Sequence, residues 1–130
     1  MRANYYWGKR SLQRLQMVHP HLVAITTLAL RQFARSDMTV VEGIRDLATQ
    51  KRYVQQGVSW TMNSKHLPQH DGYSHAIDVA PWIDGAIPWD DFEAFKLMSE
   101  DVIKAADYLG FKITWGGNWL TLRDGPHFQL

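Results

Sequence analysis

The spacing of apolar residues predicts two helices near the N-terminus. Residues 11–19 and 20–34 both have helical periodicity, and Pro20 fits the first turn of the second helix, where a missing N–H is tolerated. His19 and His21 flank this proline and mark the helix boundary. One face of the second helix carries four apolar residues, namely Leu22, Ile25, Ala29 and Phe33. This face predicts packing against a core.

The middle of the chain alternates between strand and helix patterns. The β-branched run 38–43 predicts a short strand that ends at a glycine, and 44–57 predicts a helix that a glycine terminates. The apolar positions of this helix are Leu47, Tyr53 and Val54. Residues 76–82 alternate between apolar and other residues and then meet Pro81, which is typical of a strand entering a turn.

The clearest helix lies at 89–110, where acidic residues in the first turn favour the helix dipole and Gly110 ends the helix. Its apolar stripe, predicted to be core, consists of Phe92, Phe95, Met98, Val102, Ala105 and Leu109. Short strands are predicted at 111–115 and 127–130. The pattern indicates one α+β domain over residues 1–130, with N-terminal helices, one long helix and a small, mostly antiparallel sheet.

Composition narrows the chemistry. The chain has 130 residues and no cysteine, which excludes disulfides, thiolate metal sites and a cysteine nucleophile. Any metal must therefore be held by histidine and carboxylate. The first residues lack the pattern of a signal peptide, and the most apolar run, 22–30, is too short to span a bilayer. We expect synthesis as a soluble cytoplasmic protein.

Charge is unevenly distributed along the chain. Residues 1–60 carry nine Lys and Arg against three acidic residues, whereas 61–130 carry five against ten. Two interpretations remain: solvated helix faces, or a basic face that approaches an anionic surface or polymer. No nucleic-acid-binding motif accompanies the basic half, so nucleic-acid binding is not predicted.

The segment 64–78, "SKHLPQHDGYSHAID", holds three of the six histidines and two aspartates. His66 and Asp78, together with His127 near the C-terminus, make a plausible zinc triad with an open fourth position. Asp124 stands three residues before His127, close enough to take a proton from a water at that metal. The common helical zinc-protease motifs, H-E-x-x-H and H-x-x-E-H, are absent.

A family resemblance rests on these motifs. "SKH…SHAIDVAPW" followed by "TWGGNW…DGPHF" resembles the D-alanyl-D-alanine carboxypeptidase and L-alanyl-D-glutamate peptidase family, whose phage members are endolysins. The family pattern is Ser-x-His, Ala-x-Asp and an acidic residue three before a second His, with a G-x-R ahead of a helix that "EGIRDLATQ" matches. The resemblance runs from about Val40 to the C-terminus. It implies a hedgehog- and DD-peptidase-like fold without a separate wall-binding domain.

The resemblance also implies roles for individual residues. It implies a Zn²⁺ cofactor held by His66, Asp78 and His127. Asp124 would be the catalytic base, Arg45 a cation that binds substrate or oxyanion, and Ser64 a residue that shapes the site. The fixed positive charge of Arg45 suits a tetrahedral oxyanion or a peptide carboxylate on chemical grounds as well.

The spacing between the first two ligands departs from the family pattern. The family usually has seven residues from His to Asp, with a glycine between them, whereas His66 and Asp78 are twelve apart and Ser74 takes the glycine place. We interpret "PQHDG", within 67–73, as a loop insertion. Asp71 is a rival ligand, but Asp78 is favoured because a strand holds a ligand rigidly.

Four further residues have two interpretations each. His70 and His75 are interpreted as loop residues, although His75 is also a candidate substrate contact. Trp115 and Trp119 bracket the glycines before the final motif, and each either packs in the core or walls a groove. Trp115 is retained as a candidate substrate contact.

The resemblance implies a monomeric zinc peptidase that cleaves the L-alanyl-D-glutamate bond of peptidoglycan stem peptides. As a phage endolysin it would reach the cell wall after a phage holin permeabilises the membrane. Two alternatives remain: a D-alanyl-D-alanine carboxypeptidase or dipeptidase on the same zinc site, and a non-catalytic, zinc-stabilised wall-binding module. Asp124 argues against the module, because a structural zinc site needs no base.

Overall fold

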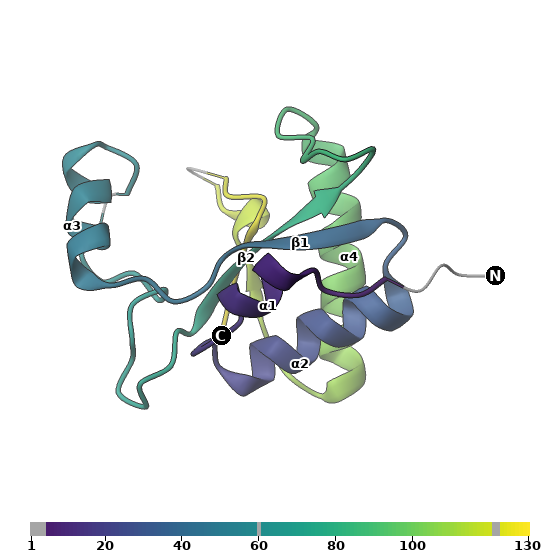
Figure 1. The fold of residues 1–130 in the computed structure, drawn as a ribbon, viewed down its shortest axis with the longest axis horizontal. Helices are drawn as coiled ribbons and strands as arrows, with labels where there is room; N and C mark the ends of the chain where they lie inside the picture. The colour runs from purple at the N-terminus through teal and green to yellow at the C-terminus, as the bar shows by residue number, and fades with distance from the viewer. Residues whose placement is uncertain (1–4, 60, 121–122) are drawn as a thin grey trace.

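A four-stranded antiparallel sheet with strand order β1-β2-β4-β3 forms the centre of the molecule. The structure, a computed structural model, describes residues 5–59, 61–120 and 123–130. Helices α2 and α4 pack against each other, α4 also contacts β2, and α1 packs against β1. Figure 1 shows α3 set apart from the other helices at one end of the molecule. The predicted α+β class, with N-terminal helices and one long helix, is confirmed.

The N-terminal helices differ from their predicted bounds. Helix α1 spans Lys9–Arg14 rather than 11–19, because Met17 has a φ of 62°, a left-handed conformation that no α-helix continues through. Helix α2 spans Pro20–Leu28, and a π-helical turn at Ala29–Phe33 completes the segment predicted as one helix. Nδ1 of His19 accepts the N–H of His21 at 3.0 Å, so this histidine caps α2 at the expected boundary.

Helix α3, Leu47–Gln55, begins three residues later than predicted. Asp46 caps it, since its carboxylate accepts the N–H of Thr49 at 2.7 Å. The helix does not bury a fully apolar face: Leu47 is 61% exposed, whereas Gln50 is fully buried. A buried glutamine needs hydrogen-bond partners, and these lie in the candidate site described below.

The long helix α4, Phe92–Leu109, starts after the capping residue Asp91 and ends at Gly110, whose φ is 80°. The central part of its predicted stripe is buried, whereas Phe92 and Leu109 at its two ends remain partly exposed. The core joins this helix to α2 and the sheet through buried side chains that include Leu22, Ile25, Val79, Val102 and Phe128. Among the described residues, no helix has the length and apolar character needed to cross a membrane.

The strands set the geometry of the site. Strand β1 spans Asp37–Glu42, β2 Ala76–Trp82, β3 Thr114–Trp115 and β4 His127–Gln129. The strand predicted at 111–115 is therefore wrong in extent, because only its last two residues pair, with β4. In the registers of β1 with β2 and of β2 with β4, Asp78 lies opposite both Glu42 and His127.

Candidate metal centre

Two histidine side chains converge on one carboxylate oxygen of Asp78 at the middle of the sheet. The strand register brings Asp78 and His127 together, and a turn before β2 adds His66. Nε2 of His66 lies 3.1 Å from Oδ1 of Asp78, and Nδ1 of His127 lies 3.2 Å from the same oxygen. These separations are close to the edge of about 3.3 Å of a tetrahedron whose centre is a metal about 2.0–2.2 Å from each ligand.

In each histidine, the outer ring nitrogen, which is the one that does not face Asp78, has a hydrogen-bond partner that fixes the tautomer. Nδ1 of His66 lies 2.8 Å from the carbonyl oxygen of Gly43, and Nε2 of His127 lies 2.8 Å from Oε1 of Gln129. Both partners are acceptors, so these outer nitrogens carry the protons. In neutral rings, the inner nitrogens then direct lone pairs at an oxygen of Asp78 that also has only lone pairs. A cation, either protons or a metal ion, must lie between them.

Burial of the two histidines strengthens the need for a positive charge beside Asp78. The relative exposure of His66 is 2% and that of His127 is 6%. Burial tends to raise the pKa of Asp78, but hydrogen bonds from His127 and His66 outweigh it and hold the pKa far below its ordinary value. Burial opposes the charged form of His127, but its hydrogen bond to Asp78 and the negative charge there raise its pKa overall. The centre is thus a buried anionic site that favours a positive charge.

Asp124 lies beside the three converging groups. Its Oδ2 is 4.0 Å from Nδ1 of His127, and its side chain is more exposed than the histidines. Burial and the negative charge of Asp78 raise the pKa of Asp124. The backbone fixes its loop, since the N–H of Asp124 donates to the carbonyl of Gly116 at 3.0 Å. A Cβ at position 116 would lie 2.6 Å from the Asp124 carbonyl oxygen, so this close approach needs glycine.

Arg45 lies just before α3 and is held from several sides. Its Nη1 donates to Oε1 of Gln50 at 2.6 Å and lies 3.5 Å from Oγ of Ser64, and its Nη2 donates to Glu42. Its guanidinium carbon stands 4.6 Å from the ring centre of Tyr53. These contacts hold the guanidinium cation in one position at the edge of the site.

Sequence reasoning missed Glu42 and Gln50. Besides accepting from Arg45, Gln50 donates from Nε2 to Oγ of Ser59 at 2.8 Å and to the carbonyl of Thr61. This network explains why a glutamine is the buried residue of α3. The signal was faint: a glutamine on an otherwise polar helix gives no pattern that separates it from a solvent-exposed residue.

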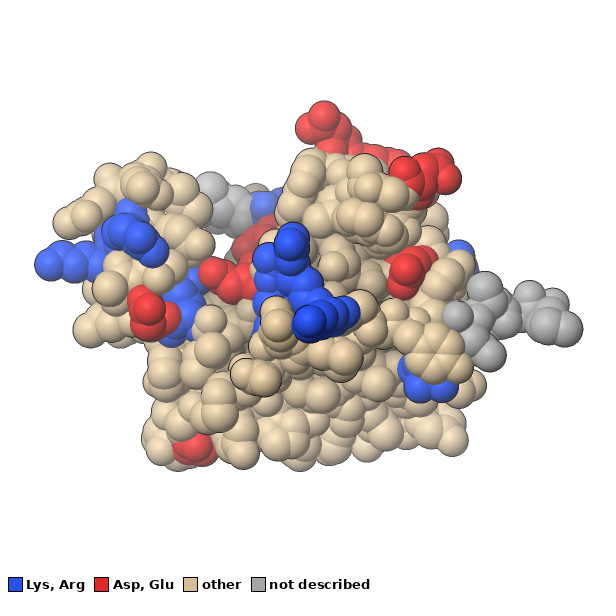
Figure 2. Space-filling model, viewed as in Figure 1, with Lys and Arg blue, Asp and Glu red and all other residues tan. Residues whose placement is uncertain are grey.

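These groups line a cleft of about 990 Å³. His66, Asp78, His127, Asp124 and Arg45 lie together in it. Much of the remaining lining comes from Tyr53, Gly57, Val58, Ser59, Thr61, Asn63, Ser64, Lys65, Trp119 and Arg123. Figure 2 shows acidic atoms in the recess between the part that carries α3 and the rest of the molecule, with basic side chains over α3 and beside the recess. The cleft therefore offers charges of both signs to a ligand.

The other residues singled out in the sequence lie in three places: the cleft, the core and a second cluster of side chains. Ser64 lines the cleft, and its Oγ accepts the N–H of His66 at 3.1 Å. Trp115 is 5% exposed and donates from Nε1 to the carbonyl of Gly125 at 2.7 Å, so the structure places it in the core. Trp119 instead lines the cleft, with its ring 5.1 Å from that of His127. His75 and Asp71 lie in a different cluster, separate from the group formed by His66, Asp78 and His127.

The chain belongs to the phage L-alanyl-D-glutamate peptidase family, because residues 3–129 match that family's model. It is 34% identical over 119 residues to the L-alanyl-D-glutamate peptidase of Escherichia phage T5, covering 89% of this chain and 82% of that protein. It is 30% identical over 103 residues to the peptidoglycan L-alanyl-D-glutamate endopeptidase CwlK of Bacillus subtilis, covering 72% of this chain and 60% of that protein.

A solved structure agrees with this assignment. The crystal structure of the Serratia marcescens L-Ala D-Glu endopeptidase ChiX is similar with a TM-score of 0.85 and 37% sequence identity. The match covers 97% of this chain and 89% of that one. The family resemblance inferred from the motifs is confirmed, and the chain is a peptidase of this family.

Proposed function

We propose that this protein uses a zinc ion to hydrolyse the bond between L-alanine and D-glutamate in the stem peptides of peptidoglycan. The observation that carries the proposal is the convergence of ligand atoms from His66, Asp78 and His127 in a cleft, with acceptors on the outer ring nitrogens of both histidines. The names of the relatives supply the bond, since those proteins are L-alanyl-D-glutamate peptidases.

The donor set fits Zn²⁺. Two imidazoles and one carboxylate are ligands of catalytic zinc sites, which keep a fourth position open. The carbonyl of Gly43 and the amide oxygen of Gln129 hold the two rings in the tautomers that a metal needs. Bound there, zinc supplies a Lewis acid that polarises a carbonyl and lowers the pKa of a water molecule.

Asp124 is the proposed base. Its carboxylate lies near His127 but outside the group of His66, Asp78 and His127. In its ionised form it would accept a proton from the attacking water. Burial and Asp78 raise its pKa, which makes its carboxylate a stronger base than a solvated aspartate. The same carboxyl group then returns the proton to the leaving amine.

Arg45 is proposed to hold negative charge on the substrate. Because Gln50 and Glu42 fix its guanidinium, the cation needs little reorganisation when a peptide carboxylate or a developing oxyanion arrives. Ser64 shapes the same wall of the cleft, where its hydroxyl lies between Arg45 and His66.

The setting of the reaction follows from the substrate. We propose that the protein acts as a monomer on the cell wall, and that a phage holin permeabilises the membrane to let it reach this substrate. The excess of Lys and Arg in residues 1–60 would attract it to an anionic envelope.

Mass spectrometry of purified peptidoglycan after digestion tests the proposed bond and the metal together. The expected product carries a new N-terminal D-glutamate, and a chelator should abolish its formation until zinc is restored. Release of free D-alanine instead would identify a D-alanyl-D-alanine carboxypeptidase on the same site. Undiminished digestion in the presence of a strong chelator would refute the zinc mechanism.

The two aspartates between 67 and 78 should respond differently to substitution. Asp78→Asn should lose the tightly bound zinc and the activity, because an amide oxygen replaces an anionic ligand at the centre. Asp71→Asn should keep both near wild-type level, since Asp71 lies in another cluster. Zinc content after dialysis and turnover on peptidoglycan measure the difference, and the reverse pattern would show that the ligand assignment is wrong.

A further inference from the structure

All six histidines of the chain lie in two groups. His66 and His127 belong to the cleft, and the other four gather where α2 begins and the segment before β2 passes it. In this second group the ring of His19 lies 4.7 Å from that of His21 and 5.0 Å from that of His75. The ring of His70 lies 6.1 Å from that of His75. Four imidazoles, which are common metal ligands, therefore lie close together at one place.

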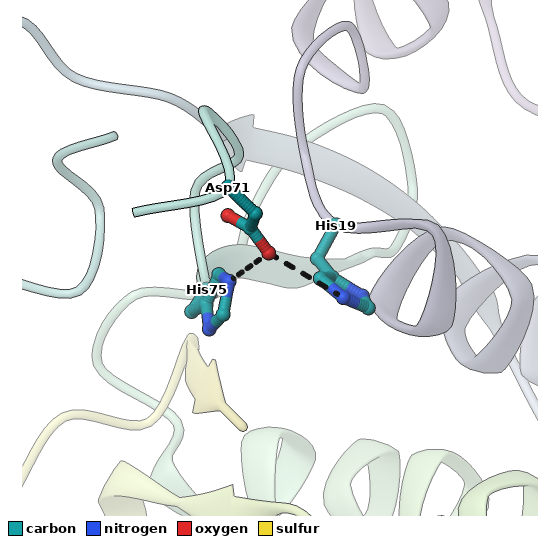
Figure 3. Close-up of side chains that lie close together, drawn as sticks. All are labelled: His19, Asp71 and His75. Atoms are coloured by element: carbon teal, nitrogen blue, oxygen red, sulfur yellow. Dashed lines mark hydrogen bonds and ion pairs between the residues drawn. The ribbon is translucent and has the colours of Figure 1, made fainter. Parts of the chain in front are cut away.

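Asp71 stands between two of these rings. Figure 3 shows its carboxylate pointing at His75 on one side and His19 on the other. Its Oδ2 lies 2.8 Å from Nε2 of His75 and 3.9 Å from Nε2 of His19. The three donor atoms lie within 4.8 Å of one another. Shifts of roughly half an ångström would bring both separations to the tetrahedral edge of about 3.3 Å that suits zinc.

The backbone holds all three residues in place. The second carboxylate oxygen of Asp71 accepts the N–H of Tyr73 at 3.1 Å, which leaves Oδ2 facing the rings. The N–H of His19 donates to the carbonyl of Ser74 at 2.9 Å. The N–H of His75 donates to Lys65 at 2.8 Å, and its carbonyl accepts from Leu130 at 3.0 Å. The donors are therefore fixed from both sides rather than carried on a free loop.

We propose that His19, Asp71 and His75 form a second site for a divalent transition metal such as Zn²⁺, separate from the catalytic cleft. The donor set, two imidazoles and one carboxylate, suits this class of ion. The ring of His21 is stacked on that of Phe111, with 4.0 Å between the ring centres, so it is not available as a fourth ligand. Water would therefore fill the fourth position. The two histidines are only partly buried, so the ion has a path from solvent.

The second site should bind its ion more weakly than the cleft. Nδ1 of His19 accepts the N–H of His21, so Nε2 of the neutral ring carries the proton in the metal-free chain. Binding through Nε2 moves that proton to Nδ1 and breaks the bond to His21, whose exposed N–H then turns to water. The rings in the cleft need no such change, since their outer nitrogens already face acceptors.

The bound ion would connect three parts of the chain. It would fasten the segment that carries Asp71 to the start of α2, through His19, and to the residue before β2, His75. That segment contains the residues that we interpret from the sequence as a loop insertion. The proposed ion would therefore cross-link this loop to α2 and β2.

Titration of the full chain carrying both His66→Ala and His127→Ala tests the site without the cleft. Zn²⁺ and Co²⁺, followed by calorimetry and by the visible absorption of cobalt, should show one bound ion per chain. Adding Asp71→Asn or His75→Ala should weaken binding at least about 10-fold, the loss that removal of even an outer partner of a ligand causes. His70→Ala is the matched control, because it removes a neighbouring histidine outside the three donors.

A second test uses the chain with His66 and His127 intact, so it does not depend on how well the double variant folds. It should take up a tightly bound ion and then a weaker second one, and Asp71→Asn should weaken only the second, again at least about 10-fold. Circular dichroism confirms that each variant is folded. Absence of a second equivalent, its survival at unchanged affinity in both Asp71→Asn and His75→Ala, or its loss in His70→Ala would overturn this assignment.

Discussion

Replacing His127 by alanine is expected to remove the tightly bound zinc and all measurable peptidase activity. The variant loses one of three ligands and leaves Asp78 with a single histidine partner in a buried place. The fold should survive, because the backbone pairing of β4 with β2 and the burial of Phe128 do not depend on the imidazole. Elemental analysis after dialysis and turnover on purified peptidoglycan are the measurements.

The control for this prediction is His70→Ala, which removes an exposed histidine outside the cleft and should keep both zinc and activity. His66→Ala should behave as His127→Ala does, since its Nε2 faces the same oxygen of Asp78. Full zinc content in both ligand variants would exclude this triad as the metal centre.

Asp124→Asn is expected to separate the chemical step from metal binding. The amide keeps the size of the carboxylate and the tight approach to Gly116, but it cannot accept a proton. General-base catalysis contributes roughly 10²–10⁴-fold, so turnover should fall by about that factor. Zinc content and thermal stability should stay near wild type, because Asp124 is outside the group of three ligands.

The matched control for this substitution is Asp107→Asn, a change of the same kind at an exposed position on α4. It should leave turnover unchanged. Wild-type turnover of Asp124→Asn would remove this residue as the base. Loss of zinc from Asp124→Asn would instead make it a ligand, and the metal centre would have to be assigned again.

The sequence by itself determined the class of fold and the residue types of the site. The apolar stripe of α4 recurs at the helical period, and Gly110 ends it, so the central part of the longest helix could be predicted from local spacing. The absence of cysteine and the Ser-x-His, Ala-x-Asp and D-G-P-H motifs restricted the candidate metal ligands to histidine and carboxylate. These features are local, because each depends on neighbours a few residues away.

Local spacing was less informative at the ends of elements and for buried polar groups. The positive φ of Met17 and the cap at Asp46 moved helix boundaries that periodicity alone had placed elsewhere. Trp115 and Trp119 have the same residue type and similar neighbours, yet the first is buried in the core and the second lines the cleft. Nothing in the sequence distinguishes the two tryptophans.

Only the tertiary structure decided which groups meet. The register of β2 with β4 sets Asp78 opposite His127, although 49 residues separate them in sequence. The carbonyl that fixes the tautomer of His66 belongs to Gly43, 23 residues earlier in the chain. The buried Gln50 that holds Arg45 is itself held by the carbonyl of Thr61, 11 residues further on. Strand pairing and polar partners are chosen by the whole packed chain, so residue type predicts the ligands whereas packing decides their geometry.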